Sequence, residues 1–283
     1  KLALLQLEKK EKEEYDYLKI LKAEYPEDDT VKQRLFLLDA KINSDRIGLN
    51  YSYTAFSREN YGPWHLAGLQ YIRERKWGSL IGRINYADRL SSGKSISDGI
   101  QYEAESYFFT GQKSYSYAGI AYSSDLAFPR LRLGYSYFQN FNNGWEADLG
   151  FRFTDAAGRE FKTGVAGIGK YLGSFWLHFR TYMQNEKKDF YPAFAITARY
   201  YFDTRFDYAA IILGYGTSPD ERTVLGQFDQ RVALSSYRFG LGYFRLLGSH
   251  FITGIQAAFN RQEYAPDARQ NEYEIAAQLQ YKF

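Results

Sequence analysis

The residue types that carry enzymatic chemistry are scarce in this sequence. It contains no cysteine and three histidines, His65, His178 and His250. Without cysteine there is no thiolate zinc site, no disulfide and no cysteine nucleophile. The histidines lack the spacing of metal ligands, and no Gly-x-Ser-x-Gly elbow occurs. Ser57 and Asn60, close to His65, form the one candidate cluster for a lipid-modifying enzyme at a membrane rim, which is kept as a third alternative. We expect no enzyme, no metal and no cofactor.

The apolar and polar residues alternate along most of the chain. The clearest case is the C-terminal segment, in which Tyr273, Leu279, Tyr281 and Phe283 occupy odd positions and polar residues occupy most even ones. A strand repeats every two residues, so one face is aromatic and the other is polar. This pattern fits a strand with hydrocarbon on one side and a wet lumen on the other. A soluble sandwich would need a second sheet over each aromatic face and would leave its edges unpaired.

The composition agrees with a barrel in an outer membrane. Aromatic residues make up 19% of the chain, with 27 Tyr and 22 Phe, and such barrels carry aromatic girdles at both interfaces. No run of about eighteen apolar residues exists, which excludes a transmembrane helix. The net charge of +3 and the lack of a basic cluster exclude nucleic acid as a partner.

Turn signals divide the sequence from residue 46 onward into about fourteen strands, with 12 or 16 possible if a hairpin is miscounted near the long connector 218–230. The predicted fold is an all-β antiparallel up-and-down transmembrane barrel over residues 45–283. Its connectors alternate between short and long, as periplasmic turns and outside loops do. An even strand number then places both termini in the periplasm. Prolines are predicted to lie in or beside the long connectors and never inside a strand: Pro63, Pro129, Pro192, Pro219 and Pro266.

Residues 1–44 have a helical period instead. Apolar residues recur three or four apart in two segments, and Pro26 with the following acidic residues separates them. The pair is either a plain helical hairpin or resembles the tail of a tetratricopeptide-like array. We expect a periplasmic helical segment that could dock other envelope proteins.

The phase of the C-terminal strand predicts which charged residues face the lumen. They are Arg83, Arg89, Glu103, Glu105, Arg130, Arg132, Glu146, Asp148, Arg152, Lys162, Lys170, Arg180, Arg199, Arg238 and Glu274, and the aromatic residues in the same phase are Tyr107, Trp176, Tyr182 and Tyr201. One interpretation is structural. Arg83 and Arg89 would pair with Glu103 and Glu105, and Arg130 and Arg132 with Glu146 and Asp148. The other is a channel whose basic excess favours anionic or sugar-like solutes.

The long connector carries the loop contact candidates Pro219, Asp220, Glu221 and Arg222. A loop of this length folds inward as a constriction or outward as a docking surface.

Several segments resemble the YaiO family of outer-membrane β-barrel proteins. They include Gly82–Leu90, Gly144–Glu146, Gly150–Phe153, Arg199–Phe202 and, most specifically, Gly214–Arg222. The resemblance spans most of residues 46–283 and implies the fold and an outer-membrane location, but no chemistry. The terminal aromatic strand, with Tyr273, Leu279, Tyr281 and Phe283, also resembles the signal that the barrel assembly machinery recognises.

The function predicted from these observations is an outer-membrane barrel in contact with lipid. It acts as a pore for small polar, anionic or sugar-like solutes, or as a subunit of an envelope complex. Protein partners would bind through residues 1–44 or through the extracellular loops. The alternative is a plugged, non-conducting barrel with a structural or assembly role.

Overall fold

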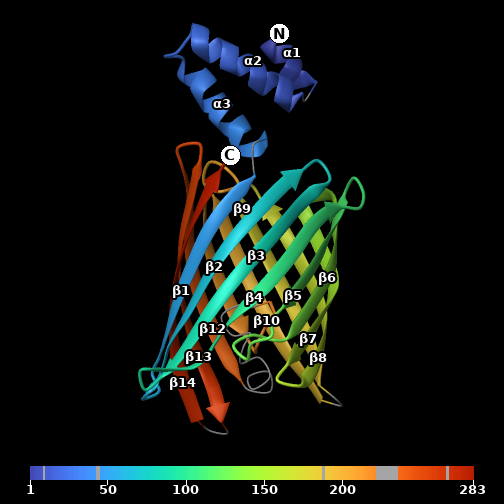
Figure 1. Ribbon diagram of the computed structural model, residues 1–283. Helices are drawn as coiled ribbons and strands as arrows, with labels where there is room; N and C mark the ends of the chain where they lie inside the picture. The colour runs from blue at the N-terminus through green and yellow to red at the C-terminus, as the bar shows by residue number, and fades with distance from the viewer. Residues whose placement is uncertain (9, 43–44, 187–188, 221–234, 266–267) are drawn as a thin grey trace.

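The computed structural model describes residues 1–8, 10–42, 45–186, 189–220, 235–265 and 268–283. Within them, three helices precede a closed barrel of fourteen antiparallel strands (Figure 1). Each strand pairs with its neighbours in sequence, and β1 pairs with β14 to close the barrel. Closure leaves no strand edge unpaired, which is the condition for spanning a membrane with strands. The predicted fold and strand number are confirmed.

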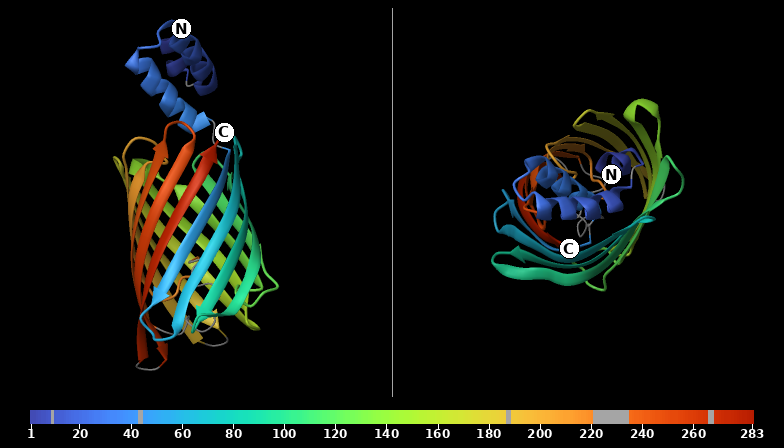
Figure 2. Two further views of the ribbon diagram at one scale, coloured as in Figure 1. Left: turned by 60° about the vertical axis from the view of Figure 1, so that its left-hand side comes forward. Right: turned by 90° about the horizontal axis from the view of Figure 1, so that it is seen from above.

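The helices are α1 (Leu2–Leu7), α2 (Glu11–Glu24) and α3 (Asp29–Ile42). The strands are β1 (Arg46–Phe56), β2 (Tyr61–Arg75), β3 (Gly78–Ser91), β4 (Lys94–Phe109), β5 (Ser114–Tyr122), β6 (Leu131–Asn140), β7 (Trp145–Ala156), β8 (Arg159–Leu172), β9 (Phe175–Glu186), β10 (Asp189–Tyr201), β11 (Tyr208–Tyr215), β12 (Ser236–Leu247), β13 (Phe251–Ala265) and β14 (Ala268–Lys282). Both termini lie at one end of the barrel, here called the terminal mouth, and the opposite end is the distal mouth (Figure 2).

Several strands extend further toward the distal mouth than the sequence predicts. Pro63 lies inside β2 and Pro192 inside β10, so the prediction that no strand contains proline is wrong. The predicted strands end where the apolar residues end, whereas the backbone pairing between neighbouring strands continues past that point. Both prolines lie near the distal ends of their strands, and the pairing of β2 with β3 shifts register between Tyr61 and Trp64. Strand ends and irregularities of this kind tolerate the missing backbone donor.

The ladder fixes which side chains face lipid. In β14 the outward Tyr273 and Ile275 are 52% and 62% exposed, whereas the inward Glu272 is 2% exposed. The same alternation runs around the barrel, so the outer surface is apolar and aromatic and the inner surface is polar. This arrangement is the one expected for a barrel in lipid.

The short turn between β2 and β3 depends on a glycine. Gly78 has φ +142°, a conformation that other residues rarely adopt. A Cβ atom at Gly78 would lie 1.9 Å from the carbonyl oxygen of Tyr107 on β4. At Gly82, four residues further along β3, an added Cβ atom would have nothing within 4 Å. Only the first of these glycines is therefore demanded by the backbone.

The helices form a small bundle of their own. Leu18, Val31 and Leu38 make its apolar core, and the side chain of Asp28 caps α3 by accepting from the backbone N–H of Thr30 at 2.8 Å. The prediction of a single helix before Pro26 is wrong, because two helices, α1 and α2, occupy that segment. None of the helices in the described ranges is both long and apolar enough to cross a membrane.

An ion pair links two of the helices. Arg34 on α3 contacts Glu14 on α2 at 2.8 Å, and the carboxylate of Glu14 is almost fully buried. The hydrogen bond from Arg34 holds the pKa of Glu14 below its ordinary value of 4.5. The carboxylate thus stays ionised at neutral pH and fastens α3 to α2.

The bundle lies over the terminal mouth (Figure 2). Phe36 of α3 packs against Leu246 and Ile252, which come from β12 and β13. The ammonium group of Lys282 on β14 contacts the carboxylate of Asp39 at 2.6 Å, and the lysine side chain is 1% exposed. An apolar contact and a buried ion pair therefore hold α3 to the barrel.

Candidate functional site

One wall of the lumen is a network of charges. Arg83 on β3 is ion-paired with Glu105 and lies 3.4 Å from Glu103, both on β4. The hydroxyl of Tyr117 on β5 donates to Glu105 at 2.9 Å, and Asn85 donates to Glu103 at 3.3 Å. Every carboxylate here meets more than one donor, which offsets the cost of its burial.

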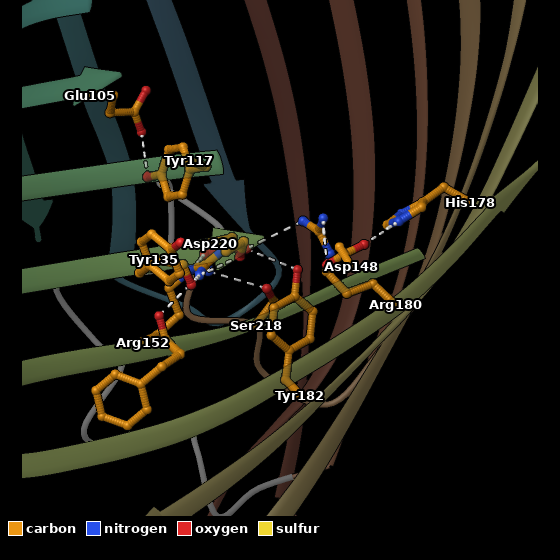
Figure 3. Close-up of polar contacts among 12 residues, drawn as sticks. Glu105, Tyr117, Tyr135, Asp148, Arg152, His178, Arg180, Tyr182, Ser218 and Asp220 are labelled. Atoms are coloured by element: carbon orange, nitrogen blue, oxygen red, sulfur yellow. Dashed lines mark hydrogen bonds and ion pairs between the residues drawn. The ribbon is translucent and has the colours of Figure 1, made fainter. Parts of the chain in front are cut away.

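The connector after β11 joins this network from inside the barrel (Figure 3). Asp220 accepts from Arg152 on β7 at 2.7 and 3.2 Å, and from the hydroxyl of Tyr182 on β9 at 3.1 Å. Arg180, also on β9, lies 3.7 Å away. The backbone carbonyl of Thr217 accepts from Gln184 at 2.6 Å. Residues 217–220 are here called the inward loop. Side chains of β7 and β9 thus hold this loop against the wall of the lumen.

The network continues toward the terminal mouth. Asp148 on β7 contacts Arg180 at 3.1 Å and His178 on β9 at 2.8 Å (Figure 3). Glu146, two residues earlier on β7, accepts from the hydroxyl of Tyr115 at 3.0 Å. Asp148 and Glu146 therefore find their partners on β9 and β5 rather than on the adjacent strand β6.

A second connector also folds inward, between β5 and β6. Ala127 and Phe128 are buried and pack against Ala87 and Leu66 on the inner face of β3 and β2. Arg89 donates to the carbonyl of Ala127 at 2.7 Å. The alternation of the strands does not predict this contact, although the apolar pair Ala127-Phe128 inside a loop is a usable signal for it.

The opposite wall leaves open space. A cavity of about 290 Å³ is lined by amide side chains, small residues and one ion pair, namely Asn50, Ser52, Leu66, Gln70, Gly254, Gln256, Ala276, Ala277, Gln278 and the pair Arg238–Glu274 at 3.0 Å. A smaller cavity of about 70 Å³ shares Arg238, Gln256 and Glu274 with it and reaches Arg199 and Tyr208.

The ladder shows where each predicted lumen residue lies. The inward positions include Arg83, Arg89, Glu103, Glu105, Arg132, Glu146, Asp148, Arg152, Arg180, Arg199, Arg238 and Glu274, together with Tyr107, Trp176, Tyr182 and Tyr201. The prediction is wrong for Lys162 and Lys170. They pair with the outward Phe153 and Trp145, and the ammonium of Lys170 lies 4.5 Å from the Trp145 ring centre.

The predicted pairing of charges is only partly right. Arg83 does meet Glu103 and Glu105, but Arg89 binds a loop carbonyl instead. Arg130 precedes β6 and pairs with Asp155 at the distal rim, with its side chain 73% exposed.

Arg132 also does not meet its predicted partners. It lies opposite Thr154, six residues along β7 from Asp148. At about 3.3 Å per residue this separation is roughly 20 Å, too far for an ion pair.

Other sequence candidates are placed as follows. Pro219 and Asp220 lie in the lumen, while Glu221 and Arg222 fall outside the described residues. The four aromatic and apolar residues of the predicted assembly signal on the last strand all face outward, and their recognition stays a prediction.

The cluster at the rim has separate contacts for its members. The Nδ1 atom of His65 bonds the Tyr51 hydroxyl at 2.7 Å, whereas the hydroxyl of Ser57 accepts from the backbone of Asn271 at 2.8 Å. Asn60 contributes its backbone carbonyl to Ser91. Within the described ranges no group of three or more acidic or histidine side chains could hold a metal ion.

Comparison with solved structures defines the class. The chain is similar to a bacterial polysaccharide outer membrane secretin, with 9% identity, a TM-score of 0.51, and 85% of this chain and 99% of that one covered. It is also similar to the outer membrane protein Omp33 of Acinetobacter baumannii, with 10% identity, a TM-score of 0.50, and 85% and 99% covered. A monoaromatic hydrocarbon channel, CymD, matches with 9% identity, a TM-score of 0.49, and 88% and 91% covered. This chain has the fold of an outer-membrane β-barrel.

The family is defined by sequence. Residues 44–221 match the model of the YaiO membrane beta barrel domain, and the chain belongs to that family. No curated protein matches it.

Proposed function

We propose that this barrel is a channel for small polar solutes, with anionic and sugar-like solutes favoured, and that both termini lie in the periplasm. The observation that carries the proposal is the amide-lined cavity of about 290 Å³ beside the network of charges. Fourteen strands enclose more space than the eight-stranded case that side chains just fill. The inward loop lies against one wall of this space, and α3 lies over the terminal mouth (Figure 2).

The polarity of the larger cavity supports the choice of sugar-like solutes. Four amide side chains, Asn50, Gln70, Gln256 and Gln278, line the larger cavity, and each offers donors and an acceptor to a hydroxyl group. The one ion pair in that cavity, Arg238–Glu274, carries no net charge. Such a lining solvates a polar molecule without trapping it by a strong field.

The test is conductance of the purified full chain in planar bilayers. A channel gives discrete steps, and liposomes that contain the protein swell in galactose at a rate above that of empty liposomes. Folding is verified first by the heat-dependent shift of the barrel in gel electrophoresis. Folded protein that stays silent at several voltages and admits no sugar would refute the channel and favour a plugged barrel.

A second candidate function is a subunit docked to envelope proteins through the helices. Leu4, Leu7 and Ile20 expose 56%, 81% and 55% of their surface on α1 and α2, and exposed apolar side chains of this kind are common at binding surfaces. Capture from native membranes with and without residues 1–44 tests this function. Partners that persist after the deletion would exclude docking through the helices.

We also propose that the barrel has no catalytic role. In support, Ser57, Asn60 and His65 are each engaged with a different neighbour. Absence of hydrolysis of phospholipid vesicles by the purified chain is the expected result, and release of fatty acid that is lost in a Ser57→Ala variant would overturn it.

A further inference from the structure

Arg199 stands apart from most of the arginines of the lumen. It projects from β10 between two aromatic rings, with its guanidinium carbon 5.0 Å from the ring centre of Trp176 and 5.1 Å from that of Tyr208. These rings come from the neighbouring strands β9 and β11. Cation–π contact with both rings holds the guanidinium in place without neutralising its charge.

Most lumen arginines are neutralised by a carboxylate. Arg83 pairs with Glu105, Arg152 with Asp220 and Arg238 with Glu274. In the part of the chain that the structure describes, Arg199 has no hydrogen bond to another side chain or to the backbone, and its buried Nε atom is without an acceptor. A buried donor without an acceptor is costly, so this position suits a ligand that supplies one.

The space beside Arg199 leads to the amides. The cavity of about 70 Å³ that Arg199 and Tyr208 line also touches Gln256 and the Arg238–Glu274 pair. The same three residues line the cavity of about 290 Å³, which adds Asn50, Gln70 and Gln278. A guanidinium, an aromatic ring and four amides therefore border two adjoining cavities along β10–β14, β1 and β2.

We propose that this space is a binding site for a sugar acid, a monosaccharide that carries one carboxylate. The carboxylate accepts from Arg199, the sugar ring lies beside Tyr208, and the hydroxyl groups bond Gln256, the amide that lines the same cavity as Arg199. One carboxylate matches one unpaired guanidinium, because Glu274 already neutralises Arg238. A neutral sugar would leave the donors of Arg199 unsatisfied, and a dianion would exceed the single free charge. The inference rests on the proposed function, since a lumen site serves transport only if the lumen conducts.

The experiment measures equilibrium binding to the full chain in detergent by calorimetry. The probes are galacturonate, galactose and acetate. Galacturonate is expected to bind more tightly than either of the other two. Arg199→Gln is expected to weaken galacturonate binding by about 10- to 100-fold, the range given by loss of a charge-assisted hydrogen bond.

Two further variants distinguish a specific binding site from a general attraction of anions by the positive charges of the lumen. Arg132→Gln removes a lumen cation that lines a different cavity and is expected to leave galacturonate affinity unchanged. Gln256→Leu is expected to weaken galacturonate but not acetate. Equal losses in Arg199→Gln and Arg132→Gln, or equal affinity for galacturonate and galactose, would overturn the site. Equal affinity for galacturonate and acetate would overturn the role of the amides.

The binding site and the channel can be refuted independently of each other. A chain that binds galacturonate but gives no conductance keeps the site and loses the channel. A chain that conducts but binds no galacturonate keeps the channel and loses the site. Quenching of Trp176 fluorescence by galacturonate, absent in Arg199→Gln, gives a second readout at the proposed position.

Discussion

Replacing Asp220 with alanine should release the inward loop from the lumen wall. Asp220 accepts two bonds from Arg152 and one from Tyr182. All three bonds are accepted by a carboxylate, and hydrogen bonds to charged groups contribute about 1.5–3 kcal/mol each. The Arg152 side chain is 8% exposed but that of Asp220 is 29% exposed, so solvent reduces the ionic part. We take about 3 kcal/mol in total, which corresponds to roughly a 100-fold change in the open population at about 1.4 kcal/mol per factor of ten.

The cysteine-free chain makes this change measurable. Thr217 is 2% exposed while the loop is docked, so a Thr217→Cys variant reacts with a maleimide only when the loop opens. Adding Asp220→Ala should accelerate labelling about 100-fold, because labelling follows the open population when opening is fast.

The matched control is Thr217→Cys with Asp155→Asn, which removes a carboxylate that pairs with Arg130 at the distal rim. It should label at the rate of the single variant. If Asp220→Ala changes the rate by less than about threefold, the ion pair does not hold the loop and our reasoning about the constriction is wrong.

Three other expectations concern the helices and the barrel. Lys282→Met should speed tryptic cleavage within the helices while the barrel stays resistant, and unchanged cleavage would mean that the buried ion pair does not hold α3. The hydrogen bond from Arg34 lowers the pKa of Glu14 in the folded chain. The ion pair therefore stabilises the helices fully above about pH 4.5, and this stabilisation is lost as the pH falls through the lower pKa of the folded state. In that pH range the ellipticity of the full chain at 222 nm should weaken more steeply than that of Glu14→Gln, and equal pH profiles would contradict this. Gly78→Ala should destabilise the barrel to urea by about 1–3 kcal/mol, whereas Gly82→Ala, which meets no atom, should not; equal midpoints would refute the role of the backbone.

The barrel itself was predictable because lipid and lumen impose a strict period of two. The aromatic alternation of β14 is evident from its residues. Fourteen such segments, joined by connectors that alternate between short and long, predict the closed barrel that the structure shows. The phase failed in β8, where Lys162 and Lys170 face outward. That strand has small residues on both faces, so its alternation is weak. Long lysine side chains near strand ends can carry their charge past the apolar band.

The contacts inside the lumen were less predictable. Sequence adjacency suggested that Arg132 would meet Asp148, but the register separates them by six residues along β7. The position of Asp220 against Arg152 joins residues 68 apart, and no local pattern encodes which way a long connector folds. Cavities such as the one beside Arg199 arise from the absence of large side chains on several strands at once.

The contact between Lys282 and Asp39 joins residues that are 243 positions apart, one at the end of the last strand and the other just ahead of the first. The helices are thus fastened to the strand that completes the barrel by pairing with β1. A change that separated β14 from β1 would therefore also remove the charged anchor of α3.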